Sequence, residues 1–176
     1  TLLKEKGHDV KVFVEEISGE YMDRALESDL VGISTTTSTA PRSYAIADKI
    51  KKLNDKIKLV MGGPHVSFMI NEALEHCDYC VIGEGEKTIT SLVEALEKKL
   101  SPASIPGLAF KKEDGRRHMK PKERPKNIED LPFPDIELID GHEDMKIIPV
   151  ATSRGCPHGC RFCSVIRMFG REYRCV

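Results

Sequence analysis

The sequence lacks an excess of charge of either sign, a long apolar run and the pattern of a secretory leader. Its 27 lysine and arginine residues nearly balance 28 aspartate and glutamate residues, which gives a net charge of −1. This balance supplies no electrostatic reason to expect nucleic acid or an anionic membrane as the main partner. No apolar run approaches the roughly 20 residues of a membrane-spanning helix, and no basic start followed by an apolar stretch opens the chain. We therefore expect a cytoplasmic protein.

The length of 176 residues allows one domain of ordinary size and part of another. An apolar content of 40% is enough for a hydrophobic core. Six cysteines would allow three disulfides in principle, at Cys77, Cys80, Cys156, Cys160, Cys163 and Cys175. Because three of them are clustered and no leader pattern is present, we expect metal ligation in a reducing compartment instead.

The first eight residues have the pattern of the last turn of an amphipathic helix. Gly7 suits the C-cap, and Lys4 and Lys6 fall in the final turn. No initiator methionine and no helix start come before this turn. We therefore expect the chain to be a piece of a longer protein, cut at both ends.

Short apolar runs rich in β-branched residues alternate with helical patterns through the first 100 residues. The runs at 10–14, 30–34, 57–61 and 79–82 are typical of buried parallel strands. A helix is predicted from Pro41, another from near Thr88, and a weaker one at 70–75. This alternation predicts an α/β fold with a doubly wound parallel sheet covered on both faces.

Ligands of doubly wound sheets bind beyond the carboxyl ends of the strands. Small, polar or flexible residues follow three of the predicted strands, in the 34–37 loop, the 62–65 loop and the 83–86 turn. The candidate binding residues are Ser34, Thr35 and Thr36, then Gly62, Gly63, Pro64 and His65, then Gly83, Glu84, Gly85 and Glu86. Ordinary strand-to-helix turns have the same composition, so both interpretations stay open at this point.

Residues 101–145 read as a connector, because prolines and a charged stretch interrupt any long regular element. Within it, 108–110 and 117–119 flank Asp114 and Gly115 and predict a small hairpin. A new strand is predicted at 146–151, leading directly into three clustered cysteines.

These cysteines, Cys156, Cys160 and Cys163, have the spacing C-x3-C-x2-C and form the cysteine loop (residues 156–163). Clustered thiolates suit zinc or an iron–sulfur cluster. Structural zinc usually takes four ligands, and His158 or Cys175 are the candidates for a fourth. Three thiolates on a four-iron cluster would instead leave one iron open for chemistry.

The cysteine spacing, with Phe162 directly before the last cysteine and a strand ahead of the loop, resembles the motif of the radical S-adenosylmethionine superfamily. The resemblance implies that Cys156, Cys160 and Cys163 bind a 4Fe-4S cluster. Its open iron would bind S-adenosyl-L-methionine, whose reductive cleavage gives a 5′-deoxyadenosyl radical. Phe162 would line the adenine side. Residues 146–176 would be the start of a partial (β/α) barrel.

The N-terminal part resembles the cobalamin-binding subgroup of that superfamily. The similarity rests on Gly-Gly-Pro-His at 62–65, Gly-Glu-Gly-Glu at 83–86, Leu-Pro-Phe-Pro at 131–134 and Thr-Ser-Arg-Gly-Cys at 152–156. It implies that residues 1–100 form a Rossmann-like, flavodoxin-type domain whose 34–37 and 62–65 loops flank the nucleotide tail of cobalamin. The 83–86 turn would lie on the same rim.

One motif of many cobalamin domains, Asp-x-His-x-x-Gly, does not occur in this chain. By resemblance it would follow the first strand, which would precede residue 1, so His8 is not the cobalt ligand. Many members of the subgroup bind cobalamin without a protein histidine. A sheet lacking this central first strand has two unpaired edges, and we expect the piece alone to be poorly stable and inactive.

The resemblance implies an enzyme that acts on a small molecule by radical methyl transfer, rearrangement or cyclisation, with an external electron donor such as flavodoxin or ferredoxin. Two alternatives remain open. The N-terminal domain would be a docking module without cobalamin, or the cysteine loop would be a structural zinc site of a non-enzymatic interaction protein.

Three other groups of residues have both a structural and a functional interpretation. Cys77 and Cys80 have the spacing of a redox or metal pair, but small core residues are the favoured interpretation. Between His65 and His76, the position at a strand end favours a functional role for His65. The basic residues near the end of the chain suit either a bound phosphate or carboxylate, or a solvated helix face. They are Arg161, Arg167, Arg171 and Arg174.

Overall fold

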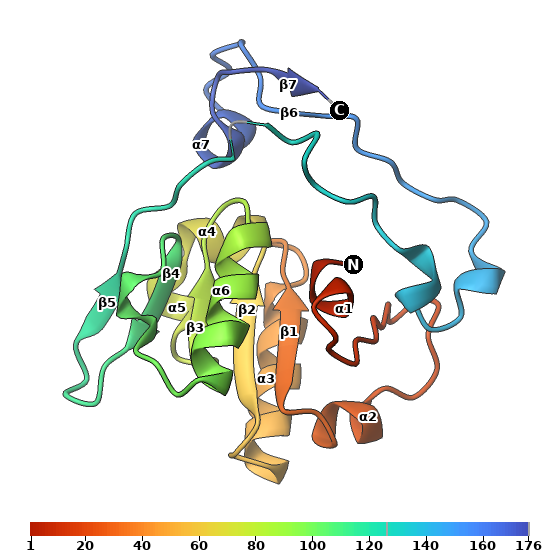
Figure 1. Cartoon of the computed structure of the whole chain (residues 1–176), viewed down its shortest axis with the longest axis vertical. Coiled ribbons are helices and arrows are strands. Elements are labelled where there is room, and N and C mark those ends of the chain that lie inside the picture. Colours follow the sequence, from red (N-terminus) through yellow and green to blue (C-terminus); the bar gives the residue numbers. More distant parts are fainter. Residues whose placement is uncertain (126, 176) are drawn as a thin grey trace.

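The computed structural model describes residues 1–125 and 127–175 and contains one five-stranded and one two-stranded sheet (Figure 1). The large sheet comprises β1 (Leu30–Ser34), β2 (Lys58–Gly62), β3 (Tyr79–Val81), β4 (Leu108–Lys111) and β5 (Arg117–Met119) in that order. The small sheet pairs β6 (Ser153–Arg154) with β7 (Arg174–Cys175). The α-helices are α1 (Leu2–Glu5), α2 (Met22–Leu26), α3 (Ala40–Leu53), α4 (Pro64–Phe68), α5 (Ile70–Ala73), α6 (Glu86–Glu97) and α7 (Val165–Phe169). Single 3-10 turns occur at Pro102–Ser104, Ile136–Leu138 and His142–Asp144.

The three strands β1, β2 and β3 are parallel neighbours, as the sequence predicts for 30–34, 57–61 and 79–82. The predicted helix from Pro41 is α3, and the weaker helix at 70–75 is the short α5. The helix predicted from near Thr88 is α6, which begins two residues earlier, within the 83–86 turn. The predicted α/β fold is therefore confirmed.

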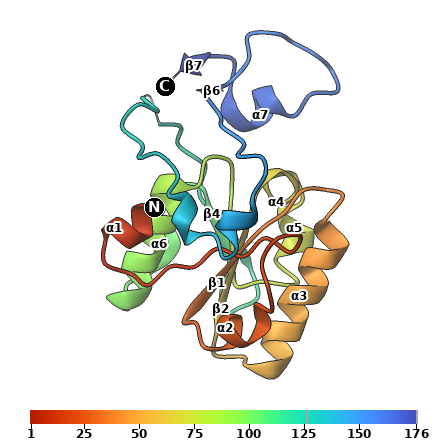
Figure 2. The ribbon, with the colours of Figure 1, turned by 90° about the vertical axis from the view of Figure 1, so that its right-hand side faces the viewer.

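Side chains alternate between two apolar layers, one on each face of the sheet. Leu59 and Met61 of β2 pack on the face covered by α3, whereas Val60 packs with Leu92 of α6 on the other face. Figure 2 shows α3 and α6 on opposite sides of the strands. Covering both faces buries the central strand, which is what parallel sheets require.

The predicted hairpin forms from β4 and β5, and it extends the same sheet. The β4 strand runs antiparallel to β3, with Cys80 opposite Ala109 and Val81 opposite Leu108. Ala109 and Leu108 are fully buried, so the hairpin contributes to the core. The sheet thus continues past residue 100, into the segment predicted to be a connector.

Two predicted strands, 10–14 and 146–151, do not form. At 10–14 the only pairing among the described residues is the single bridge between Val12 and Ile139. Residues 146–151 run as extended chain, with Ile147 81% and Val150 71% exposed, and the strand begins only at β6. A β-strand needs a hydrogen-bonded neighbour, and within the described residues neither segment has one along its length. Both strand predictions are wrong in this structure.

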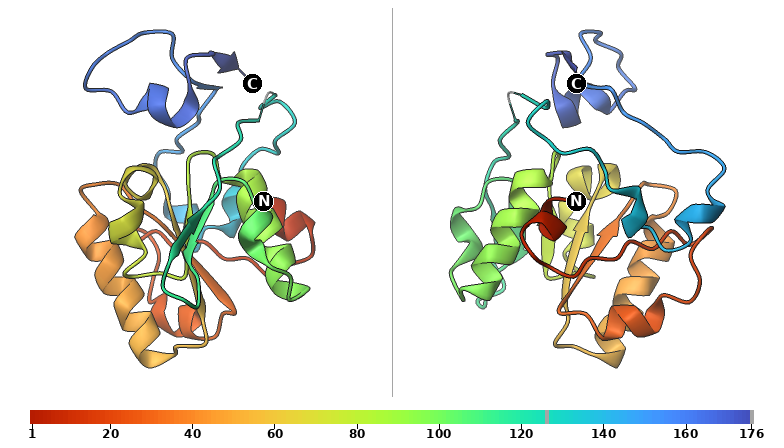
Figure 3. Two further views of the ribbon diagram at one scale, coloured as in Figure 1. Left: turned by 90° about the vertical axis from the view of Figure 1, so that its left-hand side faces the viewer. Right: turned by 45° about the vertical axis from the view of Figure 1, so that its right-hand side comes forward.

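The C-terminal segment with β6, α7 and β7 lies over the carboxyl end of the parallel strands (Figures 1 and 3). The cysteine loop joins β6 to α7 within this segment. No helix among residues 1–125 and 127–175 combines the length and the apolar character needed to cross a membrane.

Replacing Leu59 with alanine should lower the free energy of unfolding by about 2–5 kcal/mol, because its side chain is completely buried in β2. Leu53→Ala is the matched control, since Leu53 ends α3 and is 57% exposed; it should change stability by no more than about 0.5 kcal/mol. Urea denaturation of both variants measures the difference. Equal effects of the two substitutions would contradict the position assigned to β2.

Candidate functional site

The 34–37 loop, the 62–65 loop and the 83–86 turn lie together at the carboxyl edge of the sheet. The amide of Thr35 donates to the carbonyl of Gly62 at 2.9 Å, and the amide of His65 donates to the carbonyl of Thr35 at 3.1 Å. The amide of Gly83 donates to Ser67 Oγ at 2.9 Å, which ties the turn to α4. The strand ends thus form one rim, as the parallel order predicts.

Gly63 is a point of close backbone contact between the 62–65 and 34–37 loops. Its φ of 92° and ψ of −177° lie in a region that is essentially restricted to glycine. A Cβ at this position would lie 2.8 Å from the Thr35 carbonyl oxygen and 2.9 Å from the Thr35 nitrogen. Only glycine allows the two backbones to approach this closely.

The hydroxyl groups of the 34–37 loop fit a polar ligand. Thr35 is fully buried, and among the described residues its Oγ1 has no hydrogen-bond partner. Ser34 and Thr36 on either side are exposed, as is Pro64 in the neighbouring loop. A buried hydroxyl without a partner costs free energy unless a ligand or water satisfies it.

His65 points inward and joins elements behind the rim. Its Nε2 lies 3.0 Å from Tyr44 Oη of α3, and its Nδ1 lies 3.2 Å from Thr37 Oγ1. Glu72 approaches the same ring at 3.5 Å. Burial, and to a smaller extent the nearby Glu72 carboxylate, raise the pKa of Tyr44 to about 12. The Tyr44 hydroxyl is therefore protonated well beyond neutral pH. His65 thereby fixes the 62–65 loop to the 34–37 loop.

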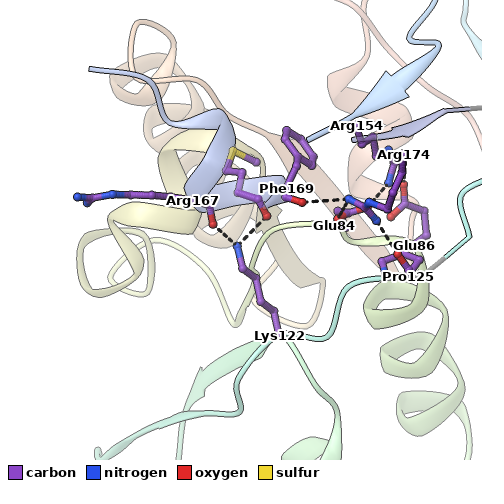
Figure 4. Close-up of polar contacts among 9 residues, drawn as sticks. Glu84, Glu86, Lys122, Pro125, Arg154, Arg167, Phe169 and Arg174 are labelled. Carbon is purple, nitrogen blue, oxygen red and sulfur yellow. Dashed lines mark hydrogen bonds and ion pairs between the residues drawn. The ribbon is translucent and has the colours of Figure 1, made fainter. Parts of the chain in front are cut away.

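The two carboxylates of the 83–86 turn are bound by arginines from the C-terminal segment (Figure 4). Arg174 Nη2 donates to Glu84 Oε1 at 2.7 Å, and Arg154 Nη1 donates to Glu84 Oε2 at 2.9 Å. The second Nη of Arg154 donates to Glu86. The 83–86 turn therefore contacts the cysteine-bearing segment directly.

The cysteine loop places its three thiols on one short stretch of backbone. Cys160 is exposed, Cys156 and Cys163 are half-buried, and all three are free. The amide of Cys163 donates to the carbonyl of Cys160 at 3.3 Å, which forms a turn between these two cysteines. Phe162, inside this turn, is 94% exposed.

No set of three or more His, Cys, Asp or Glu side chains within residues 1–125 and 127–175 is close enough to hold a metal ion. The loop therefore does not present an assembled coordination sphere. The donor set, three free thiols on one loop, nevertheless suits an iron–sulfur cluster in its chemistry. His158 and Cys175, the candidate fourth ligands of zinc, are both exposed and join no such set either.

Cys77 and Cys80 belong to the core beneath the rim. Cys80 lies in β3 and is fully buried, with its Sγ 3.6 Å from Cys77 Sγ. The hydrogen bond with Cys77 and burial raise the pKa of the Cys80 thiol far above its usual range. Cys77 Sγ donates to the carbonyls of Ala73 and Tyr79, both at 3.2 Å. These contacts support the structural interpretation of the pair.

Sequence analysis does not identify Arg154 as a partner of the 83–86 turn, or Tyr44 and Thr37 as partners of His65. Each of these contacts joins two residues that lie 21 to 70 positions apart in the sequence. For Arg174 the interpretation as part of a solvated helix face is wrong, because this residue is buried in β7 and binds Glu84 of the chain itself.

Comparison with known proteins gives a family for most of the sheet domain and relatives for the chain as a whole. Residues 1–93 match the family described as "B12 binding domain". An uncharacterized methyltransferase, PH0819 of Pyrococcus horikoshii, is 34% identical over 95% of this chain and 39% of its own length. Bacteriochlorophyllide d C-8(2)-methyltransferase of Chlorobaculum tepidum is 33% identical over 83% of this chain and 30% of its own length.

Among solved structures, the radical S-adenosylmethionine methyltransferase TsrM of Kitasatospora setae, with cobalamin and a [4Fe-4S] cluster bound, shares the fold. Its TM-score is 0.63 at 19% identity, over 88% of this chain and 34% of that chain. The present chain thus spans well under half the length of these proteins.

Gly63→Ala should destabilise the protein by about 2–5 kcal/mol, because the new Cβ adds backbone strain and overlaps the Thr35 backbone. Gly115→Ala is the matched control: its φ is also positive, at 77°, but nothing lies within 4 Å of the added Cβ. That variant should lose only about 1–2 kcal/mol from strain alone. If both variants unfold at the same denaturant concentration, the close approach of the two loops is wrong.

Proposed function

Because this chain belongs to the family of B12-binding domains, we propose that its rim holds a cobalamin and its cysteine loop a 4Fe-4S cluster that activates S-adenosyl-L-methionine. The observation that carries the cobalamin part of the proposal is the match to the B12-binding family, and the close backbone contact between Gly63 and Thr35 at the rim supports it. The family match covers both residues, since it runs from residue 1 to residue 93.

The rim residues would bind and orient the polar tail of the cobalamin. The exposed hydroxyls of Ser34 and Thr36 would donate or accept hydrogen bonds there, and the buried hydroxyl of Thr35 would join them only if the 34–37 loop opens. Gly62 and Gly63 would keep the rim free of side chains at the point of contact. His65 would hold the two loops at a fixed separation through its bonds within the core.

In the cysteine loop, Cys156, Cys160 and Cys163 would each supply one thiolate. A 4Fe-4S cluster held by three thiolates supplies one-electron reduction of S-adenosyl-L-methionine, because one iron remains available to that molecule. Phe162 is exposed beside the last cysteine, so its ring is free to line the adenine side of a bound nucleoside.

For the whole protein we propose radical methyl transfer to a small molecule, or a related rearrangement or cyclisation. The methyltransferase names of both relatives support methyl transfer as the first candidate. An external one-electron donor such as flavodoxin or ferredoxin would reduce the cluster.

A second candidate keeps the cluster but makes the sheet domain a docking platform without cobalamin. It is favoured by one observation: both carboxylates of the 83–86 turn bind arginines of the cysteine-bearing segment. The two candidates differ only in whether the rim binds cobalamin.

Titration with hydroxocobalamin distinguishes these candidates. The purified protein should bind it with a saturable change in its visible spectrum. Gly63→Ala should weaken binding about tenfold or more, because the added methyl group displaces the 34–37 loop. Gly115→Ala, at the distant hairpin turn, should bind as the wild type does. Absence of binding by the wild-type protein would reject cobalamin and favour the docking platform.

Anaerobic reconstitution with iron and sulfide tests the cluster. The wild-type protein should develop a sulfide-to-iron charge-transfer absorption, and Cys163→Ala should lose most of it because one of three thiolates is missing. Cys175→Ala is the control, since Cys175 lies in β7 outside the cysteine loop, and it should retain the absorption. Stoichiometric zinc with no cluster in the wild-type protein would establish the structural zinc site instead.

A further inference from the structure

The cysteine loop and α7 lie between β6 and β7, which form an unusually small sheet. Within residues 1–125 and 127–175, two residue pairs connect these strands: Ser153 faces Cys175, and Arg154 faces Arg174. Two-stranded ribbons are marginally stable in water even when longer than this. Contacts elsewhere must therefore hold the two ends of the segment together.

The pairing of Arg154 with Arg174 is itself unfavourable, because like charges directly opposite each other destabilise antiparallel strands. Glu84 reverses this effect by lying between the two guanidinium groups. Its Oε2 accepts from Arg154 Nη1 at 2.9 Å and from Arg174 Nη1 at 3.2 Å, and its Oε1 accepts from Arg174 Nη2 at 2.7 Å. One carboxylate thus bridges both strands of the small sheet (Figure 4).

This contact is buried, which makes its loss costly. The Glu84 side chain has no exposed area, and that of Arg174 is 6% exposed. Arg174 also donates to the carbonyls of Pro125 and Phe169, so its guanidinium is hydrogen-bonded on several sides. A buried charge that loses its partner keeps its desolvation penalty without compensation. The position of the segment therefore depends on the charge of Glu84.

Further contacts hold the base of the cysteine loop and the end of α7. The amide of Cys156 donates to the carbonyl of Gly170 at 3.1 Å. A Cβ at Gly155, whose φ is 89°, would overlap the Glu172 carbonyl oxygen. Lys122 donates to the carbonyls of Arg167 and Met168, both at 2.9 Å, at the end of α7. What fixes the base therefore fixes Cys156 directly, and Cys160 and Cys163 follow it in the same short loop.

We propose that Glu84 is a positioning residue that fixes the cysteine loop over the carboxyl edge of the sheet by bridging Arg154 and Arg174. Its carboxylate lies between the two opposed arginines, which keeps β6 paired with β7 and attaches both strands to the 83–86 turn. The proposal rests on the proposed function only in treating the cysteine loop as the cluster-binding loop.

Glu84→Gln tests the role of the charge, because glutamine keeps the shape of the side chain but presents an amide NH2 to two arginines. Amide hydrogen exchange of the metal-free protein should become roughly tenfold or more faster at 153–156 and 170–175, with β1, β2 and β3 unchanged. A side chain that only fills space would leave exchange unchanged, and that result would overturn the proposal.

Glu94→Gln is the matched control. Glu94 lies in α6, the helix that begins at Glu86 of the 83–86 turn, and forms an exposed ion pair with Lys98. Its substitution should leave exchange at 153–156 and 170–175 at the wild-type rate, because exposed pairs contribute little. Equal acceleration in both variants would overturn the specific role of Glu84.

If Glu84→Gln accelerates exchange throughout the sheet, Arg154→Gln decides the question. Arg154 is 26% exposed, and its removal leaves the Glu84–Arg174 pair in place. Exchange should then rise at 153–156 alone; an unchanged rate there would refute the bridge.

The second measurement is the rate at which a chelator removes iron from the reconstituted protein. Glu84→Gln should lose iron severalfold faster than both the wild type and Glu94→Gln, because its loop is no longer held. Equal rates in all three would refute the positioning role. A wild-type protein that takes up no cluster would refute the proposed function. The hydrogen-exchange measurement would still test whether Glu84 bridges Arg154 and Arg174.

Discussion

The buried contact of Glu84 with Arg174 and Arg154 is the interaction on which the relation between the two parts of the chain depends. It joins a turn at the carboxyl edge of the sheet to the two strands that enclose the cysteine loop. Because the carboxylate is shielded from water, its removal leaves the buried guanidinium of Arg174 without its charged partner. The proposed positioning of the cysteine loop thus rests on a residue that lies 70 positions before Arg154 in the sequence.

The rim itself depends on backbone packing. Gly63 lets the 62–65 loop touch the 34–37 loop, and His65 secures that contact from below through Tyr44 and Thr37. Gly63 brings no side chain of its own to the point where the loops meet, and the hydroxyl of Ser34 lies beside that point. The rim and the cysteine loop lie at the same end of the sheet, one built on backbone contacts and the other on buried charge.

The sequence predicts the helices and strands of this structure better than it predicts which segments and side chains contact one another. Leu59 and Leu92 sit in patterns whose period identifies a buried strand and an amphipathic helix, and both positions are confirmed as core. The segments 10–14 and 146–151 have the composition of strands. Whether a strand forms depends on a hydrogen-bonded partner, however, and composition does not indicate which partner is present. For the same reason the contact of β4 with β3 was not predictable from local pattern. The roles of Glu84 and Arg154 depend on contacts across 70 residues, which no short motif encodes.

The hairpin has a consequence for self-association. It ends the sheet on one side with β5, where Arg117 and the neighbouring Lys111 of β4 both pair with Glu75. Charged, ion-paired residues at an edge disfavour the addition of a strand from another molecule. At the other edge, β1 carries Leu30, Val31 and Ile33 without a charged residue, and it pairs there with no strand of residues 1–125 and 127–175. Of the two edges, β1 is therefore the one more open to pairing with a strand of another molecule.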